Sequence, residues 1–431
     1  MPNIVIDFSF LLNFWQELSS GGPFTAMWVL FKSGGWIVIL FALYYVIKHY
    51  YYDHIHNRWI KTVKYVLLSI DVPKNNEQSP KAVESIFAHF YGMKSSIDAK
   101  EKYIIGKFQT PFSLEIASIG GKIQFFIRVP LKYKDLVESA IYSQYPDVDI
   151  VESPDYVDKF PRKFPDPKNE IFGCDFELEN DWIYPLRTYP FFEHGLTGEF
   201  KDPMSLVLET MSNVAESEIL AIQIICVPGS LDWRKEAQKK LDKILGKSVE
   251  EKKGIIDYFL GFLSELVSYA VSPAGDGKDN KKTDDTFRML NLSPGQRKII
   301  EDIELKLSKV GFPSKVRYIH MAPHEIFKNR YSHVKGFLKQ FAALNSNDFG
   351  SVGSTMPKKN FFYHRMARAG KQTLLTKGFS HRDPSIGGPM YVLSVEELAT
   401  LWHFPALEVK APQIKKTDSK RAEPPRTLPV R

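Results

Sequence analysis

The sequence predicts an α+β protein with one transmembrane helix near its N-terminus. A nearly uncharged stretch covers residues 24–48. Beyond residue 65, short runs rich in β-branched and aromatic residues alternate with amphipathic helical patterns. The chain of 431 residues is 44% hydrophobic and 25% charged, a composition that suits one or two ordinary globular cores.

The predicted transmembrane helix, residues 24–48, is centred on Trp36–Ile47, which carries no charge. Phe24–Gly35 extends it with the single charge of Lys32, giving about 24 residues, enough to cross a bilayer. A buried core helix and a cleaved signal peptide are the alternatives, although the first 31 residues lack the Lys or Arg of a signal peptide. Residues 1–23 are predicted to lie at the membrane interface or against a partner.

Residues 49–64 form a juxtamembrane belt of aromatic and basic side chains. Tyr and Trp favour the headgroup layer of a bilayer, and Lys and Arg favour its cytoplasmic side. The belt therefore predicts a single-pass protein of the inner membrane with its N-terminus outside and the bulk of the chain in the cytoplasm. The residues predicted to lie at the membrane interface are Lys48, Tyr50, Tyr51, Arg58 and Trp59.

Residues 65–155 are predicted to form the first domain. Its strands and helices follow one another as strand, helix, strand, strand, helix, strand, and Gly120-Gly121 marks a hairpin between the middle strands. This order is that of a ferredoxin-like βαββαβ domain. The expected elements are Tyr65–Val72, Lys81–Tyr91, Ser113–Ile119, Lys122–Val129, Lys134–Tyr145 and Val148–Glu152.

Residues 165–350 are predicted to form a second, looser α+β domain, which can be interpreted as a degenerate repeat of the first. A helical insertion at 230–290 interrupts it, and within the insertion residues 272–285 have little to bury and are predicted to be disordered. The insertion also contains Ile255–Val271, which is apolar except for Asp257 and Glu265 and is interpreted as a helix facing a membrane surface or an oligomer.

Residues 351–405 combine a basic and aromatic segment with a short helix at Ser394–Leu401, where Ser394 and Glu397 form a capping box. Residues 406–431 are a Pro-rich basic tail. The basic and aromatic segment is a candidate for nucleic-acid contact, although a solvated basic segment is the favoured interpretation. The candidate residues are Lys358, Lys359, Phe361, Phe362, Arg365, Arg368 and Lys371.

The sequence predicts no enzyme, cofactor or metal site. Near Gly370-Lys371, Gln372 stands where a Walker A loop needs Ser or Thr. His324-Glu325 lacks the second histidine of a zinc-protease helix. Glu115 and Arg128 lie on the two strands of the predicted hairpin and are expected to form a cross-strand charge pair.

Three segments together resemble a known family: VPKNNEQSPKAVESIFAHFYG (Val72–Gly92), FSLEIASIGGKIQFFIRVPLKYKDLVESAIYSQYPDVDI (Phe112–Ile150), and LSVEELATLWHFP (Leu393–Pro405) leading to AEPPRTLP (Ala422–Pro429). They resemble the N-terminal, membrane-anchored region of bacterial type IV secretion and conjugative DNA-transfer ATPases. In that family an FtsK/HerA-type motor domain follows, whereas this sequence stops at Arg431. The resemblance therefore implies no catalytic residue here. Either the motor is a separate polypeptide, or this chain is an anchor without one.

The resemblance implies a membrane-anchored, non-enzymatic component of a type IV secretion-like or DNA-translocating assembly. Its expected partners are the membrane, a separate hexameric P-loop ATPase, further copies of the chain and, indirectly, nucleic acid. A membrane-bound structural scaffold of the cell envelope, with no motor or DNA partner, is the alternative. The residues expected to dock the ATPase form an acidic and aromatic cluster predicted to be partly exposed: Glu396, Glu397, Trp402, His403 and Phe404. Burial of Trp402 and Phe404 within the second domain is the alternative.

Overall fold

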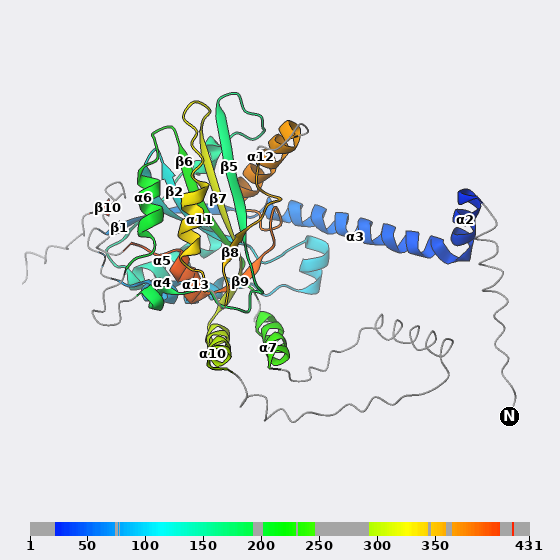
Figure 1. Ribbon diagram of the computed structural model, residues 1–431, viewed down its shortest axis with the longest axis horizontal. Coiled ribbons are helices and arrows are strands. Elements are labelled where there is room, and N and C mark those ends of the chain that lie inside the picture. The colour runs from blue at the N-terminus through cyan, green and yellow to red at the C-terminus, as the bar shows by residue number, and fades with distance from the viewer. Residues whose placement is uncertain are drawn as a thin grey trace, which may run out of the picture. The chain divides into compact units, whose positions relative to one another are not determined.

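The computed structural model divides the chain into two compact units (Figure 1). Unit 1 comprises residues up to Lys64 together with Ser96–Phe108, and unit 2 comprises Tyr65–Ser95 and the chain from Gln109 onward. The residues that the structure describes are 22–73, 76, 78–192, 201–229, 232–245, 293–343, 346–358, 364–405 and 416–417.

Unit 1 is built on helix α3 (Trp36–Ile60), which follows the short helix α2 (Pro23–Leu30) and the π-helical turn η1 (Phe31–Gly35). The turn η3 (Glu101–Ile105) packs against the second half of α3 through aromatic side chains, with the rings of Trp59 and Phe108 5.0 Å apart. Gly106 allows this close approach, since it has a φ of 79° and a Cβ there would lie 2.6 Å from the backbone of Ile55.

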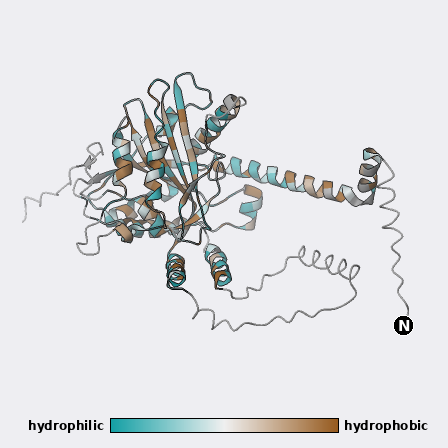
Figure 2. Ribbon diagram, viewed as in Figure 1, coloured by the Kyte–Doolittle hydropathy of each residue, from teal (hydrophilic) through white to brown (hydrophobic). Residues whose placement is uncertain are grey.

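The predicted transmembrane helix is wrong. Among the described residues, no helix is both long and apolar enough to cross a bilayer. The turn η1 separates α2 from α3, and Trp36–Ile47, the uncharged part of α3, would span only about 18 Å of the roughly 30 Å hydrocarbon core. Figure 2 shows that hydrophobic residues occupy the half of α3 next to η1, while the other half is largely polar. The single-pass inner-membrane location was inferred from that helix, so this prediction is wrong as well.

Unit 2 begins with the predicted βαββαβ order. The elements are β1 (Tyr65–Pro73), α4 (Pro80–Phe90), β2 (Phe112–Ile119), β3 (Lys122–Pro130), α5 (Lys134–Gln144) and β4 (Asp149–Glu152). The strands lie in the order β4-β1-β3-β2 and pair antiparallel, which is the ferredoxin-like arrangement. Gly120 and Gly121 both have positive φ and form the expected turn between β2 and β3.

The second part of unit 2 repeats this order around an insertion. Its elements are β5 (Asn169–Leu178), α6 (Ser205–Ser212), β6 (Ile219–Cys226), β7 (Gly311–Pro323), α11 (Tyr331–Lys339) and β8 (Phe349–Ser351). The strands lie in the order β6-β7-β5-β8, again antiparallel, so the segment is a second βαββαβ copy. The insertion, between β6 and β7, contains α7 (Asp232–Ile244) and α10 (Pro294–Ser308).

Strands β2 and β6 join the two copies into one sheet. They pair antiparallel along their whole length, from Phe112 opposite Cys226 to Ile119 opposite Ile219. Two further strands extend the sheet: β9 (Tyr391–Ser394) pairs with β7, and β10 (Lys416–Thr417) pairs with β1. The residues predicted as two separate domains therefore share a continuous sheet.

Helices cover the two faces of this sheet unequally (Figure 1). One face packs against α4, α5, α6, α11 and the short helix α13 (Val395–Leu401) through a large apolar core that includes Leu114, Ile222 and Val316. The other face is covered by the turn η5 (Tyr156–Lys159) and α12 (His364–His381), with a smaller core that includes Phe126 and Phe379.

Several predictions fall on residues outside the described ranges. These are the N-terminal segment up to residue 21, the helix at 255–271, the disordered stretch at 272–285 and all of the tail except 416–417. The short helix predicted at Ser394–Leu401 is confirmed, since α13 begins after Ser394 with both hydrogen bonds of a capping box.

Candidate functional site

The cluster predicted to dock a partner lies on and after α13, and it is buried. None of Glu396, Glu397, Trp402, His403 and Phe404 is more than 6% exposed. The expectation of partial exposure is therefore wrong. The physical reason is that α13 packs against α4 and the sheet, so the aromatic residues that follow it complete the core rather than a surface.

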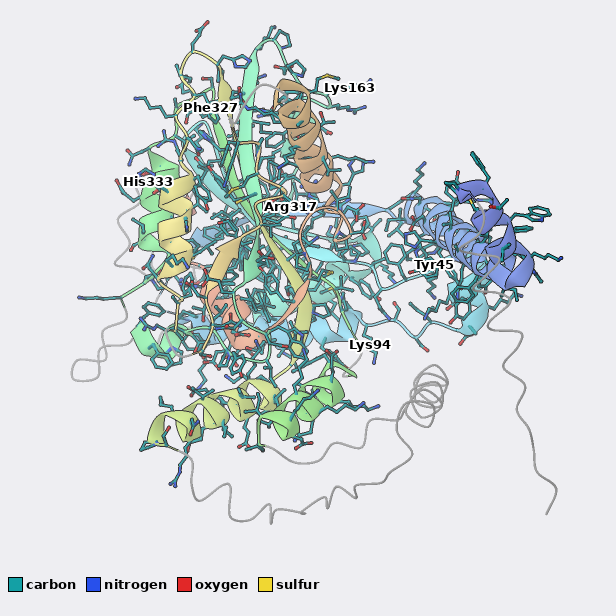
Figure 3. The ribbon with its side chains drawn as sticks, turned by 45° about the vertical axis from the view of Figure 1, so that its right-hand side comes forward. Tyr45, Lys94, Lys163, Arg317, Phe327 and His333 are labelled. Atoms are coloured by element: carbon teal, nitrogen blue, oxygen red, sulfur yellow. The ribbon has the colours of Figure 1, made fainter. Side chains whose placement is uncertain are left out.

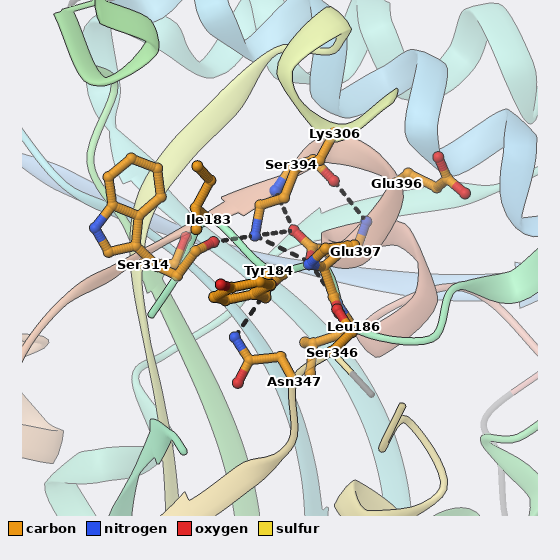
Figure 4. A network of polar contacts seen from close by, with 12 residues as sticks. Ile183, Tyr184, Leu186, Lys306, Ser314, Ser346, Asn347, Ser394, Glu396 and Glu397 are labelled. Atoms are coloured by element: carbon orange, nitrogen blue, oxygen red, sulfur yellow. Dashed lines mark hydrogen bonds and ion pairs between the residues drawn. The ribbon is translucent and has the colours of Figure 1, made fainter. Parts of the chain in front are cut away.

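Glu397 is the centre of a polar network that joins three segments (Figure 4). Its carboxylate lies 3.0 Å from Lys306 Nζ and accepts hydrogen bonds from the backbone N–H groups of Leu186, at 2.9 Å, and Ser394, at 2.7 Å. Lys306 Nζ also donates to the carbonyl of Trp182, at 2.6 Å. Burial lowers the pKa of Lys306 more than the neighbouring carboxylate raises it. Both charges are occupied by internal partners, so this network anchors α10 and α13.

The aromatic residues after α13 make equally specific internal contacts. Trp402 packs with its ring 5.8 Å from that of Phe87, and its indole N–H donates to the carbonyl of Glu115 at 3.2 Å. Phe404 contacts Phe125 at 5.5 Å between ring centres. His403 Nε2 lies 3.1 Å from Asp202 Oδ1. These contacts within the chain account for the aromatic residues of the segment, so a partner chain is not needed to explain them.

A cavity of about 370 Å³ lies beside the Glu397 network. Its wall is partly apolar, with Phe191, Ile299 and Leu305, and partly basic, with the exposed Arg187 and Lys298. Among the described residues, no three His, Cys, Asp or Glu side chains converge as a metal site would require. The cavity therefore offers apolar contact area and two exposed cations.

On the other face of the sheet, Arg382 holds a second buried charge cluster. Its guanidinium forms bidentate pairs with Glu115, at 2.9 and 3.2 Å, and with Asp155, at 2.6 and 2.9 Å. Ser113 and Tyr156 also donate to the Glu115 carboxylate, both at 2.6 Å. Burial would raise the pKa of Glu115, but the Arg382 charge and these hydrogen bonds keep it below its usual value.

The sequence did not predict the Arg382 cluster, and it predicted a different partner for Glu115. In the sheet register Arg128 lies opposite Ser113, not Glu115, and its guanidinium stacks 3.8 Å from the ring centre of Tyr65. Arg382 itself has a φ of 51°, a conformation that is uncommon outside glycine. Since it lies 267 positions from Glu115 along the chain, no local pattern could have indicated this pair.

The loop that follows Arg382 is held by further cations from β7. Lys315 donates to the carbonyls of Pro384, at 2.5 Å, and Ile386, at 3.0 Å. Arg317 pairs with Asp175 at 2.6 Å, and the backbone N–H of Gly388 donates to the same carboxylate at 2.7 Å. Burial, together with the charge of Arg317, lowers the pKa of Lys315 to about 8. These contacts bind the loop to the sheet.

The nucleic-acid candidates do not gather into one site among the described residues. Arg368 pairs with Glu170 at 2.7 Å, and Lys371 Nζ lies 3.4 Å from the carbonyl of Gly353. Lys358 is exposed, and Arg365 lies in the first turn of α12. Lys359, Phe361 and Phe362 lie outside the described residues. Contact with nucleic acid stays a prediction.

The predicted interface residues Lys48, Tyr50, Tyr51, Arg58 and Trp59 all lie on α3. Tyr51 donates its hydroxyl to the carbonyl of Tyr103 in η3, at 3.2 Å. Tyr50 is largely exposed, as is Tyr45 five residues before it (Figure 3). Unit 1 therefore displays a continuous helical surface of large aromatic and aliphatic side chains.

A single family model covers both βαββαβ copies. The model of a family described as a domain of unknown function, DUF8128, matches residues 72–417. The chain belongs to this family. The match begins at Val72, near the end of β1, and extends to β10, so it covers both copies apart from most of β1, together with the insertion, α12 and α13. No curated protein matches the chain.

Proposed function

We propose that this DUF8128 protein is a non-enzymatic subunit of a translocation-type assembly, in which it holds copies of itself and a separate hexameric P-loop ATPase. The observation that carries the proposal is the surface of α3. Large apolar side chains point outward all round its first half and remain about half exposed or more: Ile37, Ile39, Leu40, Phe41, Leu43, Tyr44, Tyr45, Val46 and Ile47.

The physical argument rests on the cost of leaving such a surface in water. Each buried aliphatic or aromatic side chain stabilises a contact by roughly 1.5–3 kcal/mol. Soluble monomers rarely expose contiguous apolar patches this long, and a helix that is apolar all round is normally buried. Other helices that pack against α3 would remove the patch from water, and copies of the same chain supply such helices.

The charged groups of unit 2 support a structural role. In the described part of the chain, the strongly buried charges of Glu115, Arg382, Lys306 and Glu397 are each saturated by internal hydrogen bonds. A catalytic acid or base must instead have a free lone pair or proton that reaches the substrate. The resemblance to the region that precedes a translocation motor supports the choice of an ATPase partner.

The test has two parts: measurement of molar mass by light scattering after size exclusion, and mass spectrometry of complexes purified from the native cells. We expect an oligomer that Leu43→Asp dissociates, while Leu131→Asp, at a leucine of similar exposure in unit 2 (47% against 51%), leaves it intact. We also expect a P-loop ATPase in the native complex. A monomeric wild-type chain would contradict self-assembly, and recovery without any ATPase would contradict the motor partner.

A further inference from the structure

A groove runs along α12 on the side away from the sheet. A cavity of about 550 Å³ lies between this helix and the segment at Phe164-Pro165. The two walls are fixed to each other, because the backbone N–H of Phe164 donates to Thr373 Oγ1 at 3.1 Å. A second cavity, of about 460 Å³, shares Thr373 and Lys377 with the first and continues the groove toward the C-terminal end of α12.

The helix side of the groove is an unpartnered apolar stripe. Met366, Gly370, Leu374 and Lys377 recur at the spacing that places them on one face of a helix. Met366 is 89% and Leu374 50% exposed. A Cβ added at Gly370 would meet no atom within 4 Å. A glycine at the centre of such a stripe allows the backbone of another helix to come close.

The rim of the groove is basic. Lys377 and Arg162 line it and are both exposed, and Lys163 projects from the same segment beside α12 (Figure 3). On α12 itself, residues 364–381 contain no Asp or Glu. Two acidic side chains also line the groove, Asp158 and, at its far end, Asp155, which is paired with Arg382. The groove therefore suits an apolar helix that carries a few carboxylates.

A segment within the insertion has this chemistry. Residues 255–271 (IIDYFLGFLSELVSYAV) are apolar except for Asp257 and Glu265, and they contain no Lys or Arg. As a helix they would be about 26 Å long, close to the roughly 27 Å of α12. We propose that the α12 groove of one chain receives residues 255–271 of a second copy, with the two carboxylates facing the cations of the rim.

A second copy is favoured as the source of the segment, because the link that would lead it to the groove of its own chain is short. Residue 245 ends the described part of α7, and residues 246–254 span at most about 35 Å. A unit of this size is about 50 Å across. Within unit 2, α7 and α10 lie at the end opposite α12 in both views (Figures 1 and 3).

Such a contact is heterologous, since each chain offers a groove to one neighbour and a segment to the other. Repetition of the contact closes a ring or extends a filament. This interface goes beyond the proposed function, because it uses different residues from the α3 surface and each can fail without the other.

The experiment places the photoreactive residue p-benzoylphenylalanine at Gly370 in the full chain and mixes isotopically heavy and light protein before irradiation. We expect cross-links to peptides within 255–271 that join a heavy chain to a light one. The matched control is the same residue at Gly336, an exposed helical glycine of α11 that also has open space around it, where no such cross-link should form. Repeating the measurement with Leu43→Asp present separates this contact from assembly through α3.

Charge reversal provides the second arm. Asp257→Lys with Glu265→Lys should lower the cross-link yield about tenfold, because two exposed ion pairs become repulsive, and Lys377→Glu with Arg162→Glu should restore it. Cross-links confined to one chain, to nucleic acid, to another protein or to other segments would overturn the proposal. A yield that is insensitive to the charge reversal would overturn it as well.

Discussion

At the scale of single residues, Arg382 determines how the last part of the chain closes over the sheet. All of its guanidinium hydrogens find acceptors, on Glu115, Asp155 and the carbonyl of Ser380. A buried charge that is satisfied in this way contributes little net energy, but it is costly to break. The left-handed backbone at Arg382 is one more local cost that these contacts offset.

We predict that Arg382→Met destabilises the fold by about 3–5 kcal/mol, because it leaves the Glu115 carboxylate buried without its cation. Urea denaturation followed by circular dichroism measures this loss. The exposed pair between Lys134 and Glu152, at 2.5 Å, provides the control, and Lys134→Met should cost much less than Arg382→Met, because water screens the pair. Similar losses for the two variants would contradict the structural role of Arg382.

His320 makes the stability of the fold depend on pH. It is fully buried on β7, with Nε2 3.4 Å from Glu218 Oε2 and its ring stacked on Phe327. Burial lowers its pKa from 6.5 to about 4, although Glu218 opposes the shift. The folded state therefore binds the proton on His320 less tightly than the unfolded state does. As a result, the stability that depends on a neutral His320 is complete above pH 6.5 and is lost as pH falls toward 4.

The free energy of unfolding should therefore fall by about 3 kcal/mol between pH 6.5 and 4 on account of this residue alone. His320→Phe removes the titrating group and should flatten that part of the pH profile, as measured by urea denaturation at each pH. Arg330 pairs with Glu218 at 3.3 Å, so Arg330→Gln, which disturbs the same cluster but retains the imidazole, serves as the control and should keep the dependence. An unchanged slope in His320→Phe would contradict the assignment to His320.

At the scale of elements, the two capping boxes have the same pattern in different surroundings. Ser394 starts α13 in the core, whereas Ser293 starts α10 at the surface, and each side chain accepts a hydrogen bond from the backbone three residues later. In the buried cap no water can replace the lost acceptor. The same motif should therefore stabilise its helix to different extents at the two sites.

We predict that Ser394→Ala destabilises the fold by about 1–2 kcal/mol and Ser293→Ala by about 0.5–1 kcal/mol. Chemical denaturation of both variants under the same conditions provides the comparison. Equal losses would mean that burial adds nothing to the cap at Ser394.

Helix α3 illustrates the limits of hydropathy at this scale. Its apolar residues are consecutive in the sequence from Trp36 to Ile47, but the helix continues through Lys48, Asp53 and Arg58. The apolar run is therefore one half of a longer helix. The sequence pattern located the apolar part of the helix, and the helix boundaries limit that part to one half of α3.

At the scale of the whole molecule, unit 2 is a duplicated sheet whose halves meet strand to strand. Trp402, near the C-terminal end of the described body, packs against Phe87 and Phe125 of the first copy. The central pairing of β2 with β6 shares backbone hydrogen bonds between the copies. We therefore expect that neither half retains its core when the other unfolds.

We predict a single cooperative thermal transition for unit 2, although it contains two ferredoxin-like copies. Calorimetry gives the number of transitions, and hydrogen exchange compares β1 of the first copy with β7 of the second, which should have equal opening free energies within about 1 kcal/mol. Gln223→Pro in β6, which removes a backbone donor from the central strand, should weaken protection in both copies. Protection lost in the second copy alone would contradict cooperativity.

Local pattern was sufficient for much of this fold. The alternation of β1 to β4 with two helices, the Gly120-Gly121 turn and the cap at Ser394 all depend on neighbours within a few residues, and the structure contains each of them. The second copy was harder to predict, because the insertion separates the two strands, β6 and β7, that a hairpin would otherwise join.

Tertiary structure alone decided the location of the charges and of the exposed surfaces. Whether Glu396 to Phe404 face water or the core depends on α4 and the sheet, more than 250 positions earlier in the chain, and Arg382 finds Glu115 across a similar separation. Side-chain chemistry determines what each group can bind, and residue spacing determines the local backbone conformation. Which groups meet is set by packing between segments far apart in the sequence, because burial is a property of the whole fold.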